Sequence, residues 1–144
     1  CIDYQDGFRI QVADIPGLID GAAEGRGKGH DFLRHVERTK ALTYIVDIAG
    51  VDYRDPVNDL NILFKEISSY GDGAMVERPS LVLANKVDLL GEEELEEKLY
   101  MGNEAVVAAG ISCASHVLPV SVGKTGEGLQ ELSKALRQVV VSAQ

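Results

Sequence analysis

Cysteine and long apolar runs are both scarce in this chain. Its 144 residues include only two cysteines, Cys1 and Cys113, without metal-like spacing. The sequence therefore predicts no disulfide framework and favours a reducing compartment. No apolar run approaches the roughly 20 residues that cross a membrane, and no signal or transit segment is visible. Because the chain opens at Cys1 in the middle of a pattern, we expect it to be a piece of a longer protein.

Positive charge is also in short supply. The chain has 14 Lys and Arg against 23 Asp and Glu, a formal net charge of −9, which argues against a general surface for polyanions. A local basic cluster is still compatible with this count, and its candidate members are Arg26, Lys28, Arg34, Arg38 and Lys40. Such a cluster could contact RNA phosphates or simply form a solvated face, and the sequence favours neither.

Apolar strands and amphipathic helices alternate along the chain. After a hairpin over residues 1–13, the predicted order is helix 30–40, strand 42–48, helix 56–70, strand 80–84, helix 92–100, strand 117–120 and helix 129–140. Residues 105–109 either continue the helix at 92–100 or start another one. This alternation predicts an α/β fold, with a mostly parallel sheet and helices on both faces. The strands at 42–48 and 80–84 look buried.

The polar tetrad Asn85-Lys86-Val87-Asp88 follows the strand at 80–84. Ligands of open α/β sheets bind just beyond the carboxyl ends of the strands, where this tetrad lies. Asp88 can accept two hydrogen bonds side by side, which matches the adjacent donors of guanine and not the edge of adenine. Asn85 can both donate and accept, and the stem of Lys86 can lie along a flat base. The alternative is an ordinary polar loop after a strand.

Two further polar motifs are expected at the same edge of the sheet. Asp14-Ile15-Pro16-Gly17 ends the second strand of the hairpin, and Ser121-Val122 follows the strand at 117–120. The glycine-dense residues 17–29 are expected to form a loop. Three such motifs in this order indicate a small GTP-binding domain.

The first motif extends into a more specific pattern. The run Asp-Ile-Pro-Gly-Leu-Ile-Asp-Gly-Ala from Asp14, followed by Gly-Lys-Gly-His-Asp-Phe-Leu-Arg-His-Val-Glu-Arg-Thr from Gly27 to Thr39, closely resembles the Obg family of GTPases. The resemblance covers nearly the whole chain and implies the P-loop NTPase fold of small G proteins. Obg-family proteins are ribosome-associated GTPases that act in assembly of the large subunit, in bacteria, mitochondria and chloroplasts. Their glycine-rich N-terminal domain is not in this sequence.

The resemblance also implies ligands and residue roles. It implies GTP or GDP with Mg²⁺, which Asp14 would hold through a water, and a Gly17 N–H close to the γ-phosphate. Residues 17–29 would be a switch that orders when GTP binds. The implied GTP-binding residues are Asp14, Ile15, Pro16, Gly17, Asn85, Lys86, Asp88, Ser121 and Val122. Val122 departs from the alanine that is usual in the family.

Two expected parts of such a domain are not found in residues 1–144. No phosphate-binding loop occurs. The run Gly123-Lys124-Thr125 looks like the end of one, but such a loop needs a glycine five residues before its Gly-Lys, and that position is Leu118. The run is predicted to be a turn into the last helix. Leu18 stands where Ras-like proteins place the catalytic glutamine, so no catalytic base is assigned. The first strand, the phosphate loop and the first helix of this partial G domain (residues 1–144) would lie before Cys1. We therefore expect the segment alone to bind GTP weakly and to be inactive.

The sequence thus predicts a GTP-hydrolysing switch that acts on the large ribosomal subunit and its RNA. The alternative is a degenerate, non-hydrolysing scaffold in an assembly complex. His30 and His35 lack the i, i+4 spacing of a metal pair. The insertion-like stretch from Leu99 to Ser115 favours the mitochondrial matrix or another organelle over the bacterial cytoplasm.

Overall fold

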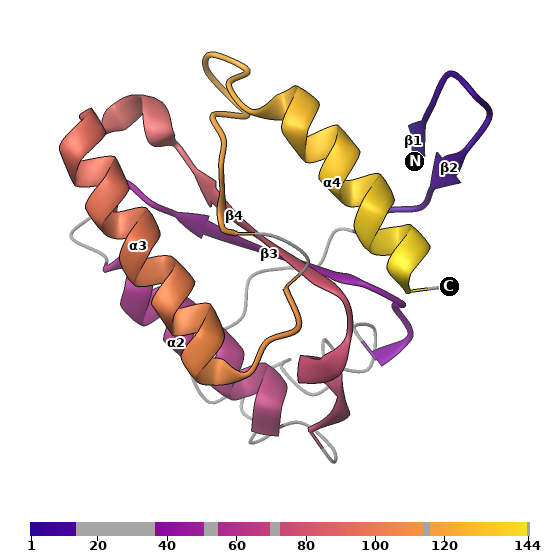
Figure 1. Cartoon of the computed structure of the whole chain (residues 1–144), viewed down its shortest axis with the longest axis horizontal. Helices are drawn as coiled ribbons and strands as arrows, with labels where there is room; N and C mark the ends of the chain where they lie inside the picture. Colours follow the sequence, from indigo (N-terminus) through magenta and orange to yellow (C-terminus); the bar gives the residue numbers. More distant parts are fainter. Residues whose placement is uncertain (14–36, 51–54, 70–72, 114–115, 144) are drawn as a thin grey trace.

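The described part of the chain is built around one small parallel sheet. The computed structural model describes residues 1–13, 37–50, 55–69, 73–113 and 116–143 (Figure 1). The elements follow in the order β1 (Ile2–Asp3), β2 (Arg9–Ile10), β3 (Leu42–Asp47), α2 (Pro56–Ser69), η3 (Ala74–Glu77), β4 (Ser80–Asn85), η4 (Val87–Leu89), α3 (Glu92–Ala109), β5 (Leu118–Pro119) and α4 (Leu129–Ser142). None of the helices in these ranges is both long enough and apolar enough to span a membrane.

Strand β4 lies in the middle of this sheet. It pairs in parallel with β3 along its whole length, from Leu42 opposite Ser80 to Asp47 opposite Asn85. On its other side it pairs in parallel with β5, where Ala84 faces Pro119. The order is therefore β3-β4-β5, and all three strands end at the same edge.

Helices cover both faces of the sheet. On one face, Leu60 and Phe64 of α2 and Val106 of α3 pack in one cluster with the inward side chains of β3 and β4. On the opposite face, Ala135 and Val139 of α4 pack with Leu81 of β4. Figure 1 shows α2 and α3 together on one side of the strands and α4 on the other. The predicted α/β fold class is confirmed.

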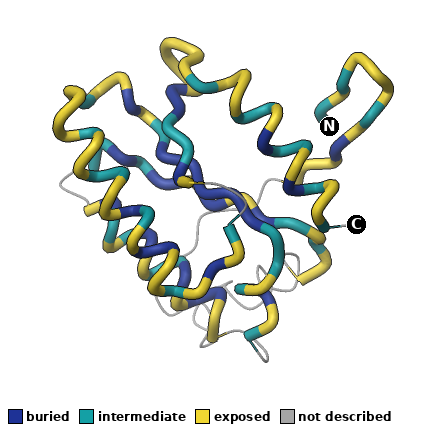
Figure 2. The backbone as a smooth tube through the Cα atoms, in the orientation of Figure 1, coloured by how far each residue is buried: buried dark blue, intermediate teal, exposed yellow. Residues whose placement is uncertain are grey.

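Burial differs between the two long strands. Leu81, Val82 and Ala84 of β4 are fully buried, as the apolar run predicts. Strand β3 was expected to be buried as well, but only one of its faces is, since Tyr44 is 4% exposed and Ile45 is 62% exposed. The physical reason is that the described helices cover only the Tyr44 face of β3. Figure 2 shows this alternation along the strand.

The ends of the helices follow from local chemistry. Helix α2 begins at Pro56, which suits the first helical position, and the Asp55 carboxylate accepts a 3.0 Å hydrogen bond from the Val57 N–H. Helix α3 runs to Ala109, so residues 105–109 continue the helix predicted at 92–100 and do not start another one. It stops at Gly110, whose φ of 72° is the left-handed conformation that commonly ends a helix.

The predicted N-terminal hairpin forms and is attached to α4. Strands β1 and β2 pair antiparallel, and the Tyr4 hydroxyl donates a 2.6 Å hydrogen bond to the Ser133 carbonyl of α4. The Arg137 guanidinium lies 4.6 Å from the centre of the Phe8 ring. It also pairs with Asp6 and lowers the pKa of that carboxyl group. These contacts join segments that are far apart in the sequence.

Replacing Phe64 with alanine should strongly destabilise this domain. Phe64 is 2% exposed, and its ring meets Tyr44 edge to face, with 5.2 Å between the ring centres. We expect the free energy of unfolding to fall by about 3–5 kcal/mol, because the change removes apolar burial and leaves a cavity. Urea unfolding followed by circular dichroism measures the loss.

The matched control is Val107→Ala, at a site of α3 that is 80% exposed. It should change the free energy of unfolding by less than about 0.5 kcal/mol. Equal losses in the two variants would contradict the assigned core.

Candidate functional site

The tetrad Asn85-Lys86-Val87-Asp88 lies at the carboxyl edge of the sheet, immediately after β4. Lys86 has φ 69° and ψ 33°, and it is the only residue other than glycine with a positive φ in the described ranges. This left-handed turn ends the strand abruptly and costs about 1–2 kcal/mol for a residue with a side chain. Such strain is typical of functional sites, where neighbouring contacts hold it in place.

Val87 anchors the tetrad to the interior. Its side chain is 3% exposed and belongs to the core that α2 and α3 form with the sheet. Its N–H donates a 3.3 Å hydrogen bond to the carbonyl of Val120, just after β5. The one apolar member of the tetrad thus fixes the backbone that carries the three polar members.

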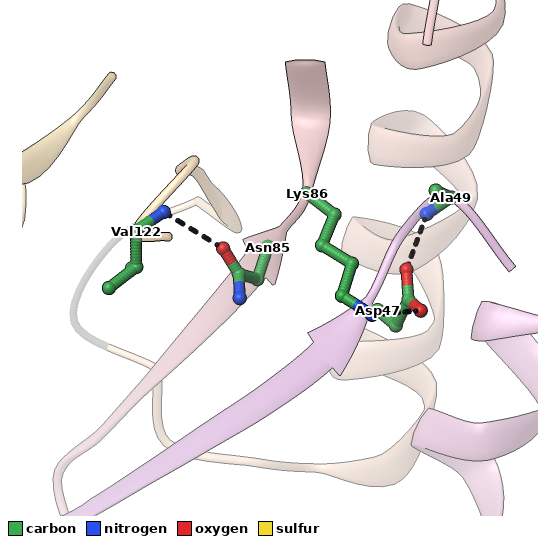
Figure 3. A network of polar contacts seen from close by, with 5 residues as sticks. All are labelled: Asp47, Ala49, Asn85, Lys86 and Val122. Carbon is green, nitrogen blue, oxygen red and sulfur yellow. Dashed lines mark hydrogen bonds and ion pairs between the residues drawn. The ribbon is translucent and has the colours of Figure 1, made fainter. Parts of the chain in front are cut away.

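Asn85 and Asp88 are both tied to the segment after β5. The Val122 N–H donates a 3.1 Å hydrogen bond to Asn85 Oδ1 (Figure 3), which leaves the amide NH₂ for an acceptor on a ligand. The Ser121 hydroxyl, 1% exposed, donates a 2.7 Å hydrogen bond to Asp88 Oδ1. The structure therefore brings Ser121 and Val122 against the tetrad, at the place that the sequence predicts.

The segment from Ser121 to Gly128 folds back on itself before α4. The Ser121 N–H donates to the Glu127 carbonyl at 3.0 Å, and the Gly126 N–H donates to the Ser121 carbonyl at 2.8 Å. Gly123-Lys124-Thr125 lies within this turn, between β5 and α4, as predicted. Its position after the last strand is not that of a phosphate-binding loop, which joins the first strand to the first helix.

Lys86 turns to the other neighbour of β4. Its ammonium Nζ lies 3.0 Å from Asp47 Oδ2 at the end of β3, and Asp47 Oδ1 accepts a 3.0 Å hydrogen bond from the Ala49 N–H (Figure 3). Asp47 is not among the site residues that the sequence predicts. Its position in the sequence could have indicated this, because Asp47 ends a predicted strand and the carboxyl ends of parallel strands meet at one edge of a sheet.

A hollow lies between the tetrad and the loop after β5. Its volume is about 270 Å³, and its lining consists of Asn85, Lys86, Asp88, Leu89, Ser121, Gly123 and Lys124. Pockets for whole small ligands are typically about 300–1,000 Å³. The hollow therefore suits one part of a ligand, such as a planar base.

The remaining predicted site residues lie outside the described ranges. They are Asp14, Ile15, Pro16 and Gly17 of the first motif and Arg26, Lys28 and Arg34 of the basic cluster. Arg38 and Lys40 are described and exposed. Within the described ranges no three His, Cys, Asp or Glu side chains are grouped to hold a metal ion. The fit of Mg²⁺ at Asp14 therefore remains a prediction.

Replacing Gly128 with alanine should disrupt the loop that carries Ser121 and Val122. Gly128 has φ 79°, and a Cβ added there would lie 2.4 Å from the Pro119 carbonyl oxygen. We expect the free energy of unfolding to fall by about 2 kcal/mol or more, because left-handed strain is joined by a clash with backbone. Denaturant unfolding measures it.

Gly110→Ala is the matched control. Gly110 has φ 72°, but an added Cβ would meet nothing within 4 Å, so this variant carries the strain without the clash. A Gly128→Ala loss no larger than that of Gly110→Ala would contradict the close approach of Gly128 to β5.

Comparison with known proteins places the chain in a family. Residues 1–86 match the family model described as 50S ribosome-binding GTPase. GTPase Obg of Lachnoclostridium phytofermentans is 45% identical over 131 residues, which cover 91% of this chain and 29% of that protein. GTPase Obg of Alkaliphilus metalliredigens is 48% identical over 126 residues, 88% of this chain and 27% of that protein.

The likeness extends along almost the whole chain. GTPase Obg of Desulfitobacterium hafniense (strain DSM 10664 / DCB-2) is 42% identical over 146 aligned residues, which cover 96% of this chain and 31% of that protein. The chain thus spans less than a third of the length of these relatives. The chain belongs to the 50S ribosome-binding GTPase family, and the resemblance to Obg that its motifs predict is confirmed.

Proposed function

We propose that this chain is the base-recognising part of a GTP-binding and GTP-hydrolysing switch of the Obg type. The observation that carries the proposal is the pair of hydrogen bonds from Ser121 and Val122 to Asp88 and Asn85. These bonds hold a carboxylate and an amide beside a hollow at the sheet edge. An ordinary polar loop would need no such support from a second loop.

In the proposed site, one carboxylate and one amide recognise guanine. The Asp88 carboxylate, with two oxygens and no proton, accepts from the ring N–H and the exocyclic amine of guanine. The Asn85 NH₂, left over by the bond to Val122, donates to an acceptor on the base. Adenine offers the reverse polarity to Asp88. If adenine entered, the charged acceptor on Asp88 would be left without a hydrogen bond, which is costly. The site would therefore select guanine.

The phosphates and Mg²⁺ are assigned to the first motif. Asp14 is proposed to hold Mg²⁺ through a water, and the Gly17 N–H to approach the γ-phosphate, with Ile15 and Pro16 shaping the turn between them. When bound, the metal would stabilise negative charge on the phosphates. Leu18 cannot orient a water, so we expect slow intrinsic hydrolysis, with the water positioned by backbone, an ion or a partner.

The proposed partner is the large ribosomal subunit with its RNA. The support is the description of the matched family as 50S ribosome-binding GTPase. Arg38 and Lys40 are exposed and, with Arg26, Lys28 and Arg34, are the proposed contacts to RNA phosphate. A net charge of −9 would confine any such contact to this local cluster.

A non-hydrolysing scaffold is the second candidate function. It is favoured by one observation, the lack of a phosphate-binding loop within residues 1–144. Single-turnover GTP hydrolysis by the full-length protein separates the two candidates. Measurable hydrolysis supports the switch, and guanine nucleotide binding without hydrolysis, with or without ribosomes, supports the scaffold.

The compartment is a separate proposal. We propose an organelle such as the mitochondrial matrix, because of the insertion-like stretch from Leu99 to Ser115, with the bacterial cytoplasm as the alternative. In the described part of this stretch, residues 99–109 complete α3, and Cys113 forms a parallel bridge with Ser80 of β4. Imaging of the tagged full-length protein would decide between the compartments.

Replacing Asp88 with asparagine should transfer the preference from guanine to xanthine nucleotides. The amide donates where xanthine carries a carbonyl in place of the amine of guanine, and its oxygen still accepts from the Ser121 hydroxyl. We expect the affinity of the full-length protein for GTP to fall about 10- to 100-fold, the cost of a hydrogen bond to a charged group. Competition titrations with GTP and XTP measure the change.

Asp55→Asn is the control for this experiment. Asp55 caps α2 and lies outside the proposed site, so the nucleotide preference should not change. An unchanged preference for GTP in Asp88→Asn would remove the tetrad from the proposed site.

Residues 1–144 by themselves should bind GDP weakly or not at all. The backbone cradle and lysine of a phosphate loop provide much of the nucleotide affinity in this class of protein, and neither occurs in this segment. Titration with a fluorescent GDP analogue tests this, with circular dichroism to confirm that the segment is folded. Tight binding by the folded segment would contradict the prediction.

A further inference from the structure

Asp47 is held rigidly at the edge of the proposed base site. It is the last residue of β3 and lies opposite Asn85 in the parallel register. Its side chain is 26% exposed. One carboxylate oxygen accepts from the Ala49 N–H and the other pairs with Lys86 Nζ, each at 3.0 Å. Both oxygens are therefore engaged, so the carboxylate is a fixed acceptor rather than a freely rotating surface group.

Lys86 is the more exposed member of this pair. Its side chain is 47% exposed, and a lysine with that exposure loses considerable rotamer freedom when it is held in one position. The left-handed backbone at Lys86 and the contact with Asp47 together set where the side chain lies. Figure 3 shows the lysine stem extended from the end of β4 to Asp47 at the end of β3.

We propose that Asp47 is a positioning residue for guanine nucleotide binding, because its ion pair holds the stem of Lys86 along the wall of the base site. The inference rests on the proposed function, in which that stem lies against the face of the base. Lys86 lines the hollow together with Asn85 and Asp88. Its charged end is bound to Asp47, which does not line the hollow. The apolar part of the side chain is thereby left to face the ligand.

The proposed role of Asp47 differs from that of Asp88. Asp88 would bind the hydrogen-bonding edge of the base. Asp47 acts indirectly, by positioning Lys86 against the flat face of the base. Loss of Asp47 should therefore weaken GDP and XDP to the same extent and leave the preference between them unchanged. Because the pair is partly exposed, its effect should also fade as salt screens it.

A double-mutant cycle on the full-length protein tests the proposal. Asp47→Asn removes the charge but keeps an oxygen for the Ala49 N–H, and Lys86→Met removes the ammonium group but keeps an apolar stem. We expect Asp47→Asn to weaken GDP binding about two- to fivefold at low salt, the range of exposed ion pairs. In the Lys86→Met background the same change should have no further effect.

Two further measurements separate positioning from a general structural role. In 1 M KCl, where the screening length is about 3 Å, the loss of GDP affinity in Asp47→Asn should be smaller than at low salt. Asp47→Glu, which keeps the charge, should recover most of the affinity lost in Asp47→Asn. Asp3→Asn, which removes the exposed ion pair with Arg9 in the hairpin, is the matched control and should leave the affinity for GDP unchanged.

The possible failures are distinguishable. Unchanged GDP affinity in Asp47→Asn at low salt, or an equal loss with and without Lys86, would overturn the role of Asp47. A loss that is undiminished in 1 M KCl, or that Asp47→Glu shares in full, would also overturn it. The proposed guanine site itself fails only if Asp88→Asn keeps its preference for GTP, whatever Asp47→Asn does.

Discussion

The parallel pairing of β4 with both of its neighbours is the constraint on which the rest of the structure depends. The pairing with β3 places Asp47 opposite Asn85, and the pairing with β5 carries the chain on to Ser121 beside the same strand end. Since parallel strands all end at one edge, three segments that are distant in sequence deliver polar groups to one place. The helices on both faces bury the central strand β4 and so hold this register.

Because of the turn at Lys86, the polar side chains of the tetrad contact both neighbours of β4. Asp88 and Asn85 bond with the segment after β5, and Lys86 bonds with β3. The buried Val87 fixes the backbone between them. A left-handed lysine is costly by itself, and it persists because contacts on both sides over-determine its position. The strain, the anchor and the polar contacts thus act as one arrangement.

Local patterns predicted much of this architecture. The apolar run before Asn85 correctly indicated a strand buried on both faces. The same reasoning was wrong for Ile45, which is exposed on β3. Hydrophobicity along a strand cannot show whether a helix covers each face, since that depends on elements elsewhere in the chain.

By itself the sequence determined the fold class, the order of the elements and the chemistry available at the end of β4. These follow from periodicity and from residue types, which are local properties. Only the tertiary structure decided which partner each polar group has. Asn85 meets Val122, 37 positions away, and Lys86 meets Asp47, 39 positions away. Such pairs depend on strand register and on one left-handed turn, and no local pattern encodes the register between strands that are joined by long helical crossovers.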